Sequence, residues 1–150
     1  MEAERKFFTA VGDCSSSKLP EHDCNTQVIL RVEILSSREL KRDHNSGIGH
    51  LDALNKTLRS LIIQSFHQLG TVDVVDFCAS GRKDGSFDVE IAVANKGSKD
   101  RKWTGKSIKP DCAIAILDAL VDAYNLALCD LLDEAPAASS KRKESAVVAV

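Results

Sequence analysis

The sequence lacks any large excess of charge of one sign. Among its 150 residues, 20 lysines and arginines stand against 22 aspartates and glutamates, and the formal net charge is −2. A chain this close to neutral has no long-range field that would attract nucleic acid or an anionic membrane. We therefore expect neither of them as a partner.

Long apolar runs are also missing. No unbroken apolar stretch approaches the roughly 18 residues that a membrane-spanning helix needs. The first residues include Glu2 and Glu4, and no apolar core follows them. Such a start is not typical of a signal or transit peptide.

The five cysteines lack the spacing of a disulfide framework or a zinc site. Their number is odd, no two form a C-x-x-C pair, and none has a histidine at ligand spacing. Reduced thiols fit this pattern better, and they are typical of the cytoplasm. The sequence therefore predicts a cytoplasmic protein that holds no metal or other cofactor.

What the sequence does contain is alternation of apolar and polar residues, which indicates strands with one buried face. The alternation is clearest in residues 27–34 and 86–94. Shorter apolar runs at residues 7–11 and 72–79 predict two further strands. Residues 13–25, in contrast, mix serines, a proline and charges, and they predict a loop.

Two local signals refine the second half of the chain. Val74 and Val75 are adjacent and break the alternation, which indicates a β-bulge. The segment Lys83-Asp84-Gly85 favours a hairpin turn between the strands on either side of it.

Two segments show apolar residues at helical spacing. The first helix is predicted to begin near His50. The second is predicted from Asp111 to about Leu132, with Asp111 as the N-cap after Pro110. The apolar face of the second helix is wider than the roughly 100° that packing on one sheet requires. Its surplus face should pack on another helix, either in this chain or in a partner.

The order strands, helix, strands, helix predicts an α+β fold built from two β-β-β-α units about sixty residues apart. Gly47 before the first helix matches Gly105 before the second. A lone unit could not cover its sheet, so the two units should share a core. The expected repeats span about residues 7–69 and 71–132. Residues 1–26 are expected to form an N-terminal strand and loop, 27–132 the domain itself, and 133–150 a flexible tail.

A glycine turn is predicted before each helix, at residues 47–53 and 105–111. Glycine allows the backbone to approach a ligand closely, and free N–H groups before a helix favour an anion. A small carboxylate could dock there with apolar side chains around the rest of it. Spacing alone favours simple strand-to-helix turns over a binding site, because single G-x-G matches are weak signals.

Three segments resemble the regulatory domain of 2-isopropylmalate synthases. Residues 47–53, G-I-G-H-L-D-A, resemble the family's G-N-G-P-V-D-A segment, and residues 74–77, V-V-D-F, resemble its L-x-D-Y segment. Residues 105–125 resemble G-x-G-x3-D-I-I-x-A-S-x-x-A-Y-x-x-A-L-N without gaps. Trp103 and residues 119–122 also look like citramalate synthase. The resemblance covers residues 27–128 well.

The resemblance implies a non-catalytic domain that pairs with a second copy and binds leucine or isoleucine between the protomers as a feedback effector. A separate synthase catalytic chain is a further implied partner. Carried onto the matching positions, the effector contacts come from the first glycine turn, from an apolar pocket and from the second glycine turn. These residues are Gly47, Ile48, Gly49, Leu51, Val74, Phe77 and Ser107.

The sequence departs from the family pattern at four matched positions. His50 stands for a proline, Phe77 for a tyrosine, Ser107 for a glycine and Ile116 for a serine. The fold expectation is unaffected. Loss of the tyrosine hydroxyl removes a polar contact, which keeps open a second interpretation, a structural homodimer without a ligand.

Signals for an enzyme are weak. Gly105-Lys106-Ser107 looks like the end of a P-loop, but Asp100 stands where that motif requires a glycine. The sequence contains nothing that resembles the catalytic barrel of the synthases. An unrelated small α+β enzyme remains the third interpretation.

Overall fold

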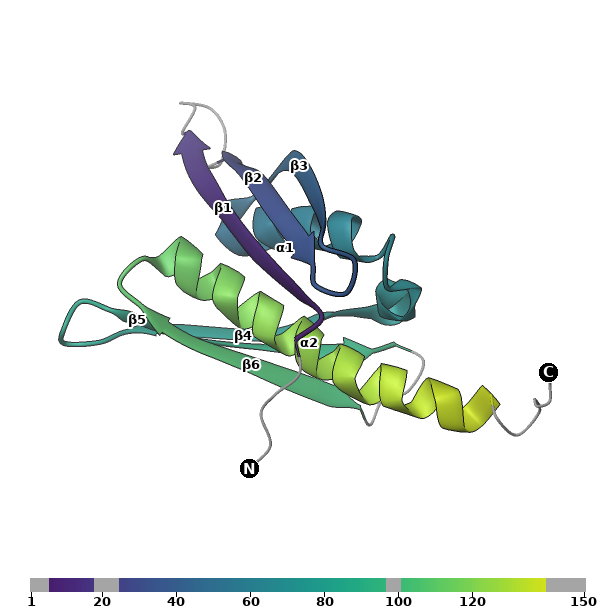
Figure 1. Ribbon diagram of the computed structural model, residues 1–150. Coiled ribbons are helices and arrows are strands. Elements are labelled where there is room, and N and C mark those ends of the chain that lie inside the picture. Colours follow the sequence, from purple (N-terminus) through teal and green to yellow (C-terminus); the bar gives the residue numbers. More distant parts are fainter. Residues whose placement is uncertain (1–5, 18–24, 97–100, 140–150) are drawn as a thin grey trace.

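Two antiparallel three-stranded sheets, each followed by a helix, form the protein in the computed structural model, which describes residues 6–17, 25–96 and 101–139 (Figure 1). The first unit contains β1 (Phe8–Ser17), β2 (Asn25–Ile34), β3 (Glu39–Gly47) and α1 (Gly49–Ile62). The short 3₁₀ helix η1 (His67–Thr71) leads to β4 (Val72–Gly81), β5 (Phe87–Asn95), β6 (Lys102–Lys109) and α2 (Cys112–Ser139). The sheets have the orders β1-β2-β3 and β4-β5-β6. The predicted pair of β-β-β-α units is therefore confirmed.

The two units share one core. Helix α1 packs on β2 and β3, whereas α2 packs on β5 and β6 and also contacts α1 and β1. Figure 1 shows α2 running between its own sheet and β1. The predicted surplus face of the second helix thus packs on a helix of this same chain. The largest fully buried side chains include Phe8, Leu30, Leu54, Leu58, Ile91, Leu120, Tyr124 and Leu128.

The local signals in the second unit are confirmed. The pairing of β4 with β5 shifts between Val74 and Asp76, which leaves Val75 as the extra residue of a bulge. In the hairpin loop, the N–H of Arg82 donates to the carbonyl of Ser86 at 2.8 Å, and Gly85 has a φ of +92°. At the start of α2, the N–H of Ile114 donates to Asp111 Oδ1 at 3.1 Å, as expected of an N-cap.

The boundaries of several elements differ from the predictions. Residues 13–17, predicted as part of a loop, continue β1, because their backbone pairs with β2 whatever their side chains are. Helix α2 passes its predicted end and continues to Ser139, although Pro136 is unfavourable inside a helix. The remainder of the predicted loop (18–24) and of the predicted tail (140–150) lies outside the described residues.

Among the described residues, one helix is long and apolar enough to cross a membrane by length and composition. It is the segment Cys112–Leu132 of α2, with a mean hydropathy of 1.7. Aspartates interrupt the apolar residues of this segment, so it contains no long unbroken apolar stretch. A buried core helix meets the same criterion, and 56% of this segment is buried inside the protein. The helix therefore acts as the central core helix.

Asn125 ties the first strand to the last helix. Its Oδ1 accepts a hydrogen bond from the N–H of Phe7 at 2.7 Å, and its Nδ2 donates to the carbonyls of Phe8 at 3.1 Å and Val121 at 3.0 Å. Only 4% of Asn125 is exposed. This residue, matched above to an asparagine of the family pattern, therefore satisfies backbone groups at the start of β1, among them the buried N–H and carbonyl of Phe8.

Asn125→Leu is expected to lower the free energy of unfolding by about 1–3 kcal/mol, because buried backbone groups lose their partners. Urea unfolding followed by circular dichroism measures the change. Asn45→Leu is the matched control, because Asn45 is half-exposed and its Oδ1 accepts from the adjacent Ser46 N–H. Equal stability of the two variants would contradict a structural role for Asn125.

Candidate functional site

The turn into α1 is open and depends on a glycine. Gly49 has a φ of +87°, and a Cβ built there meets no atom within 4 Å. The preceding N-cap residue, Ile48, makes no side-chain capping bond and is 73% exposed. The first N–H groups of a helix have no acceptor within it and carry the positive end of its dipole. The turn can therefore receive a small anion.

Asp52 holds this turn in shape. Its Oδ2 accepts a hydrogen bond from the N–H of Ile48 at 3.0 Å, and it lies 3.7 Å from Lys56 Nζ. The same ammonium group donates to the carbonyl of Ser46 at 3.3 Å. The backbone on both sides of Gly49 is thus fixed to the first two turns of α1.

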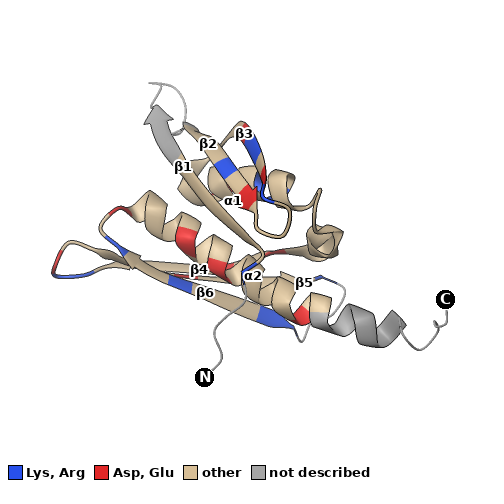
Figure 2. Cartoon of the chain, viewed as in Figure 1, with Lys and Arg blue, Asp and Glu red and all other residues tan. Residues whose placement is uncertain are grey.

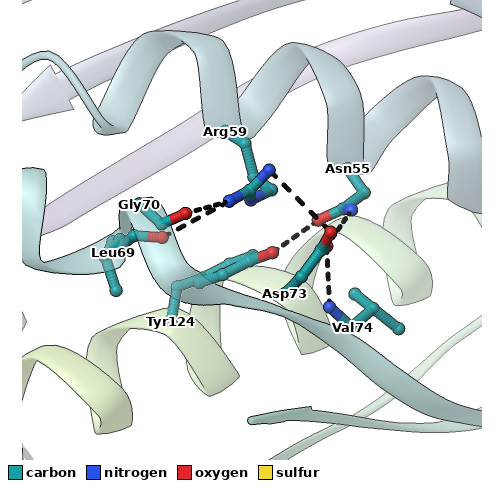
Figure 3. A network of polar contacts seen from close by, with 7 residues as sticks. All are labelled: Asn55, Arg59, Leu69, Gly70, Asp73, Val74 and Tyr124. Atoms are coloured by element: carbon teal, nitrogen blue, oxygen red, sulfur yellow. Dashed lines mark hydrogen bonds and ion pairs between the residues drawn. The ribbon is translucent and has the colours of Figure 1, made fainter. Parts of the chain in front are cut away.

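A network of polar contacts joins α1 to the beginning of β4 and to α2 (Figure 3). Asn55 donates to Asp73 Oδ1 at 3.0 Å and accepts from the hydroxyl of Tyr124 at 2.7 Å. Burial raises the pKa of Tyr124 well above its usual value, so that the hydroxyl stays protonated and donates. Arg59 lies 3.9 Å from the other carboxylate oxygen of Asp73 and donates to the carbonyl of Gly70 at 3.3 Å.

This network fixes the direction of α1 relative to β4. Arg59 contacts Gly70, whereas Asn55, one turn closer to the start of the helix, contacts Asp73. Figure 3 shows Asn55 and Val74 at one end of the network, with Leu69 and Gly70 at the other. Leu51 lies a further turn towards the helix start on the same face as Asn55. The start of α1 therefore lies on the side of Asn55 and Asp73 rather than on the side of Arg59 and Gly70.

Val74 and Phe77 lie on the face of β4 that belongs to the core side of its sheet. They pair with Val93 and Ile91, which are fully buried beneath α2. Because α2 packs over β5 and β6, the edge strand β4 is less covered. Phe77 is consequently 40% exposed, and it forms an apolar surface beside the strand.

Ser107 lies elsewhere. It pairs with Val89 on β6, at the opposite edge of the sheet from β4, so two strand spacings of about 5 Å each separate the two strands. Ser107 lines a cavity of about 460 Å³ beside α2. Within one chain the structure therefore does not bring Ser107 to Val74 and Phe77.

The cavity beside Ser107 has a lining that the sequence did not predict. Lys106, Asp118 and Asp122 supply charges of both signs, and Val121 and Leu126 supply apolar surface. Asp122 Oδ2 accepts from the N–H of Lys106 at 3.2 Å. Asp118 and Asp122 are four residues apart on an otherwise apolar helix, so they lie on one face of it. This spacing is the sequence signal from which the charged lining could have been predicted.

The second predicted glycine turn is wrong. Gly105 and Ser107 lie within strand β6, and the chain turns only after Lys109. A Cβ at Gly105 would collide with the backbone of α2 at Ala119 and Ala123. Gly105 is therefore a close-packing glycine, which allows strand and helix to touch, rather than the start of an anion-binding turn.

No group of three or more histidine, cysteine, aspartate or glutamate side chains that could hold a metal occurs within the part of the chain described above. Cys78 is an exposed free thiol, and Cys112 and Cys129 are half-buried free thiols. Partial burial raises the pKa of Cys112, and the nearby Asp111 charge adds to the effect. A thiol with a raised pKa is a poor nucleophile at neutral pH.

Comparison with known proteins identifies the chain. The model of the LeuA allosteric (dimerisation) domain matches residues 16–128. A probable 2-isopropylmalate synthase from Methanosarcina acetivorans is 33% identical over 84 residues, which cover 54% of this chain and 15% of that protein. The fold of two β-β-β-α units and the matched residues lead to one conclusion: the chain belongs to the LeuA allosteric (dimerisation) domain family.

Proposed function

We propose that this domain binds a branched-chain amino acid, leucine or isoleucine, as a feedback effector at the turn of Gly49, and that it does so as a homodimer. The observation that carries the proposal is the polar network of Asn55, Asp73 and Arg59. It ties α1, which begins at Gly49, to the beginning of β4, the strand that carries the half-exposed Phe77.

The chemistry of such a ligand matches this surface. Its carboxylate would accept hydrogen bonds from the free N–H groups at the start of α1. Its aliphatic side chain would lie on the apolar surface of Ile48, Val74 and Phe77, as in most small-molecule sites. In a single chain this surface is open, since Ile48 is 73% and Phe77 40% exposed. A second copy would close it, and could bring its own Ser107 to the ligand.

Gly49→Ala is expected to weaken leucine or isoleucine binding by at least about 10-fold, as measured by calorimetry. A Cβ at a φ of +87° strains the turn and projects into the space where the carboxylate would dock. Gly85→Ala is the matched control, because Gly85 has a φ of +92° and equally open surroundings in the distant β4–β5 hairpin. The control should bind like the unmodified protein.

Two results would count against this proposal. Unchanged affinity of Gly49→Ala would remove the turn from the site. No heat and no thermal shift of the unmodified protein with leucine, isoleucine or valine would favour a structural dimerisation module without a ligand, which the replacement of the family tyrosine by Phe77 would suit.

We also propose that the regulated reaction belongs to a 2-isopropylmalate or citramalate synthase catalytic chain in the cytoplasm. The chain spans 15% of the length of the synthase that it matches, so the reaction itself is not assigned to it. Size-exclusion chromatography with a candidate synthase, with and without leucine, tests this association. Acyl transfer from acetyl-CoA to a 2-oxo acid by the purified chain would contradict a non-catalytic role.

A further inference from the structure

The outer face of the first sheet carries two arginines side by side. Arg31 on β2 and Arg42 on β3 are direct cross-strand neighbours. Both are exposed, and neither makes a hydrogen bond or an ion pair with any residue that the structure describes. Figure 2 shows basic residues on these two neighbouring strands. Like charges placed directly opposite each other destabilise a sheet.

The remaining arginines of the described segments behave differently. Each of them has a carboxylate within 4 Å. The pairs are Arg38 with Glu33 at 2.8 Å, Arg59 with Asp73 at 3.9 Å, Arg82 with Asp88 at 3.5 Å and Arg101 with Asp130 at 3.6 Å. Among the described arginines, only Arg31 and Arg42 have no carboxylate within 4 Å, and these two lie opposite each other across the strands.

The same face is hollowed around these arginines. A cavity of about 400 Å³ is lined by Val11, Gly12, Ile29, Arg31 and Arg42. A second cavity of about 270 Å³ shares Ile29 and Arg42 with it and adds Asp43 and His44. Val11 is 58% and Ile29 53% exposed, so the floor between the charges is apolar. The first volume falls within the range of small-molecule sites.

We propose that this face binds a small organic anion of two or more negative charges, held by Arg31 and Arg42 together, with its apolar part on Val11 and Ile29. A planar guanidinium group matches the oxygen pairs of carboxylates and phosphates, and two of them side by side match a dianion. Such a ligand would also neutralise the repulsion between the two side chains.

This site is independent of the effector site proposed above. Val28, Leu30 and Val32 of β2 are buried on the face that carries α1, whereas Ile29 and Arg31 alternate with them and point to the other side. The turn of Gly49 belongs to α1 and lies on the opposite face of the sheet. Loss of one site is therefore expected to leave the other intact, so the two proposals can fail separately.

The test is calorimetry with pyrophosphate and with citrate in 150 mM NaCl, where non-specific surface attraction is screened beyond roughly 8 Å. Arg31→Gln and Arg42→Gln are each expected to weaken binding at least about 10-fold, and the double variant to abolish it. Arg38→Gln and Arg82→Gln, which remove arginines from exposed ion pairs, are the matched controls and should bind normally. Preference for pyrophosphate or for citrate identifies the head group as phosphate or carboxylate.

A second measurement needs no ligand. Removal of one guanidinium group relieves the repulsion, so Arg42→Gln should raise the melting temperature of the free protein by about 1–4 °C. Absence of binding to both anions at millimolar concentration would overturn the proposal, as would equal binding by the double variant. Dissociation of a dimer in Arg31→Gln or Arg42→Gln would also overturn it, because the face would then be an interface between copies.

Discussion

Leu117→Asp is expected to leave the chain unfolded, with a loss of more than about 4 kcal/mol in the free energy of unfolding. Leu117 lies on α2 with 4% of its surface exposed, inside the core cluster shared by both units. A carboxylate placed there would lose its water without gaining a partner. Because α2 contacts both sheets and α1, the damage reaches the whole domain.

The matched control for this variant is Ile114→Asp, one turn earlier on the same helix. Ile114 is 47% exposed, so the new charge stays hydrated, and the variant should remain folded. Circular dichroism and urea unfolding compare the two proteins. A folded Leu117→Asp with an unchanged melting temperature would show that α2 faces another way.

Gly105→Val is expected to give the second largest effect, a loss of about 3 kcal/mol or more, and Gly105→Ala a loss of about 1–3 kcal/mol. The added Cβ would collide with the Ala119 carbonyl and the Ala123 nitrogen. Both are backbone atoms, so no side chain can rotate to make room. Strand β6 and helix α2 would have to separate, and this would open the core along their full contact.

Gly81→Ala serves as the control for this pair. A Cβ at Gly81 meets no heavy atom within 4 Å, so this alanine should be neutral or slightly stabilising. Thermal and urea unfolding of Gly81→Ala and Gly105→Ala provide the comparison. If both variants were equally stable, the close contact between β6 and α2 would not exist in solution.

The central strands of both sheets could be predicted because each has one buried and one exposed face. In β2, the buried Val28, Leu30 and Val32 alternate with exposed residues. In β5, the exposed Glu90 separates the buried Val89 and Ile91, but the small Ala92 is buried as well. The edge strand β3 carries no such pattern. Its side chains make polar contacts with α1 and the segment after it: Ser60 of α1 donates to Asp43 at 3.2 Å, and Lys41 donates to Gln64 beyond the helix end at 3.0 Å. Alternation therefore could not locate β3.

The candidate site was predicted in part. A glycine before an amphipathic helix is a local signal, and the turn at Gly49 lies where that signal placed it. The hydrogen bond between Asn55 and Tyr124 spans 69 residues of sequence, so no local pattern could reveal it. The sequence predicted Ser107 in a turn because Gly105 precedes it. In the structure Gly105 lies in β6, where the absence of a side chain allows the strand to pack closely on α2.

The bond from Asn125 to the backbone of Phe7 has a consequence for the order of folding. It joins residues 118 positions apart, and it holds the first strand of the first unit to the final helix of the second. The start of β1 would therefore gain its hydrogen bond to Asn125 only after α2 has been synthesised. Contacts between such distant positions slow folding, because a long loop must close before they form. The two repeats, although alike in topology, are therefore expected to fold as one cooperative unit rather than one after the other.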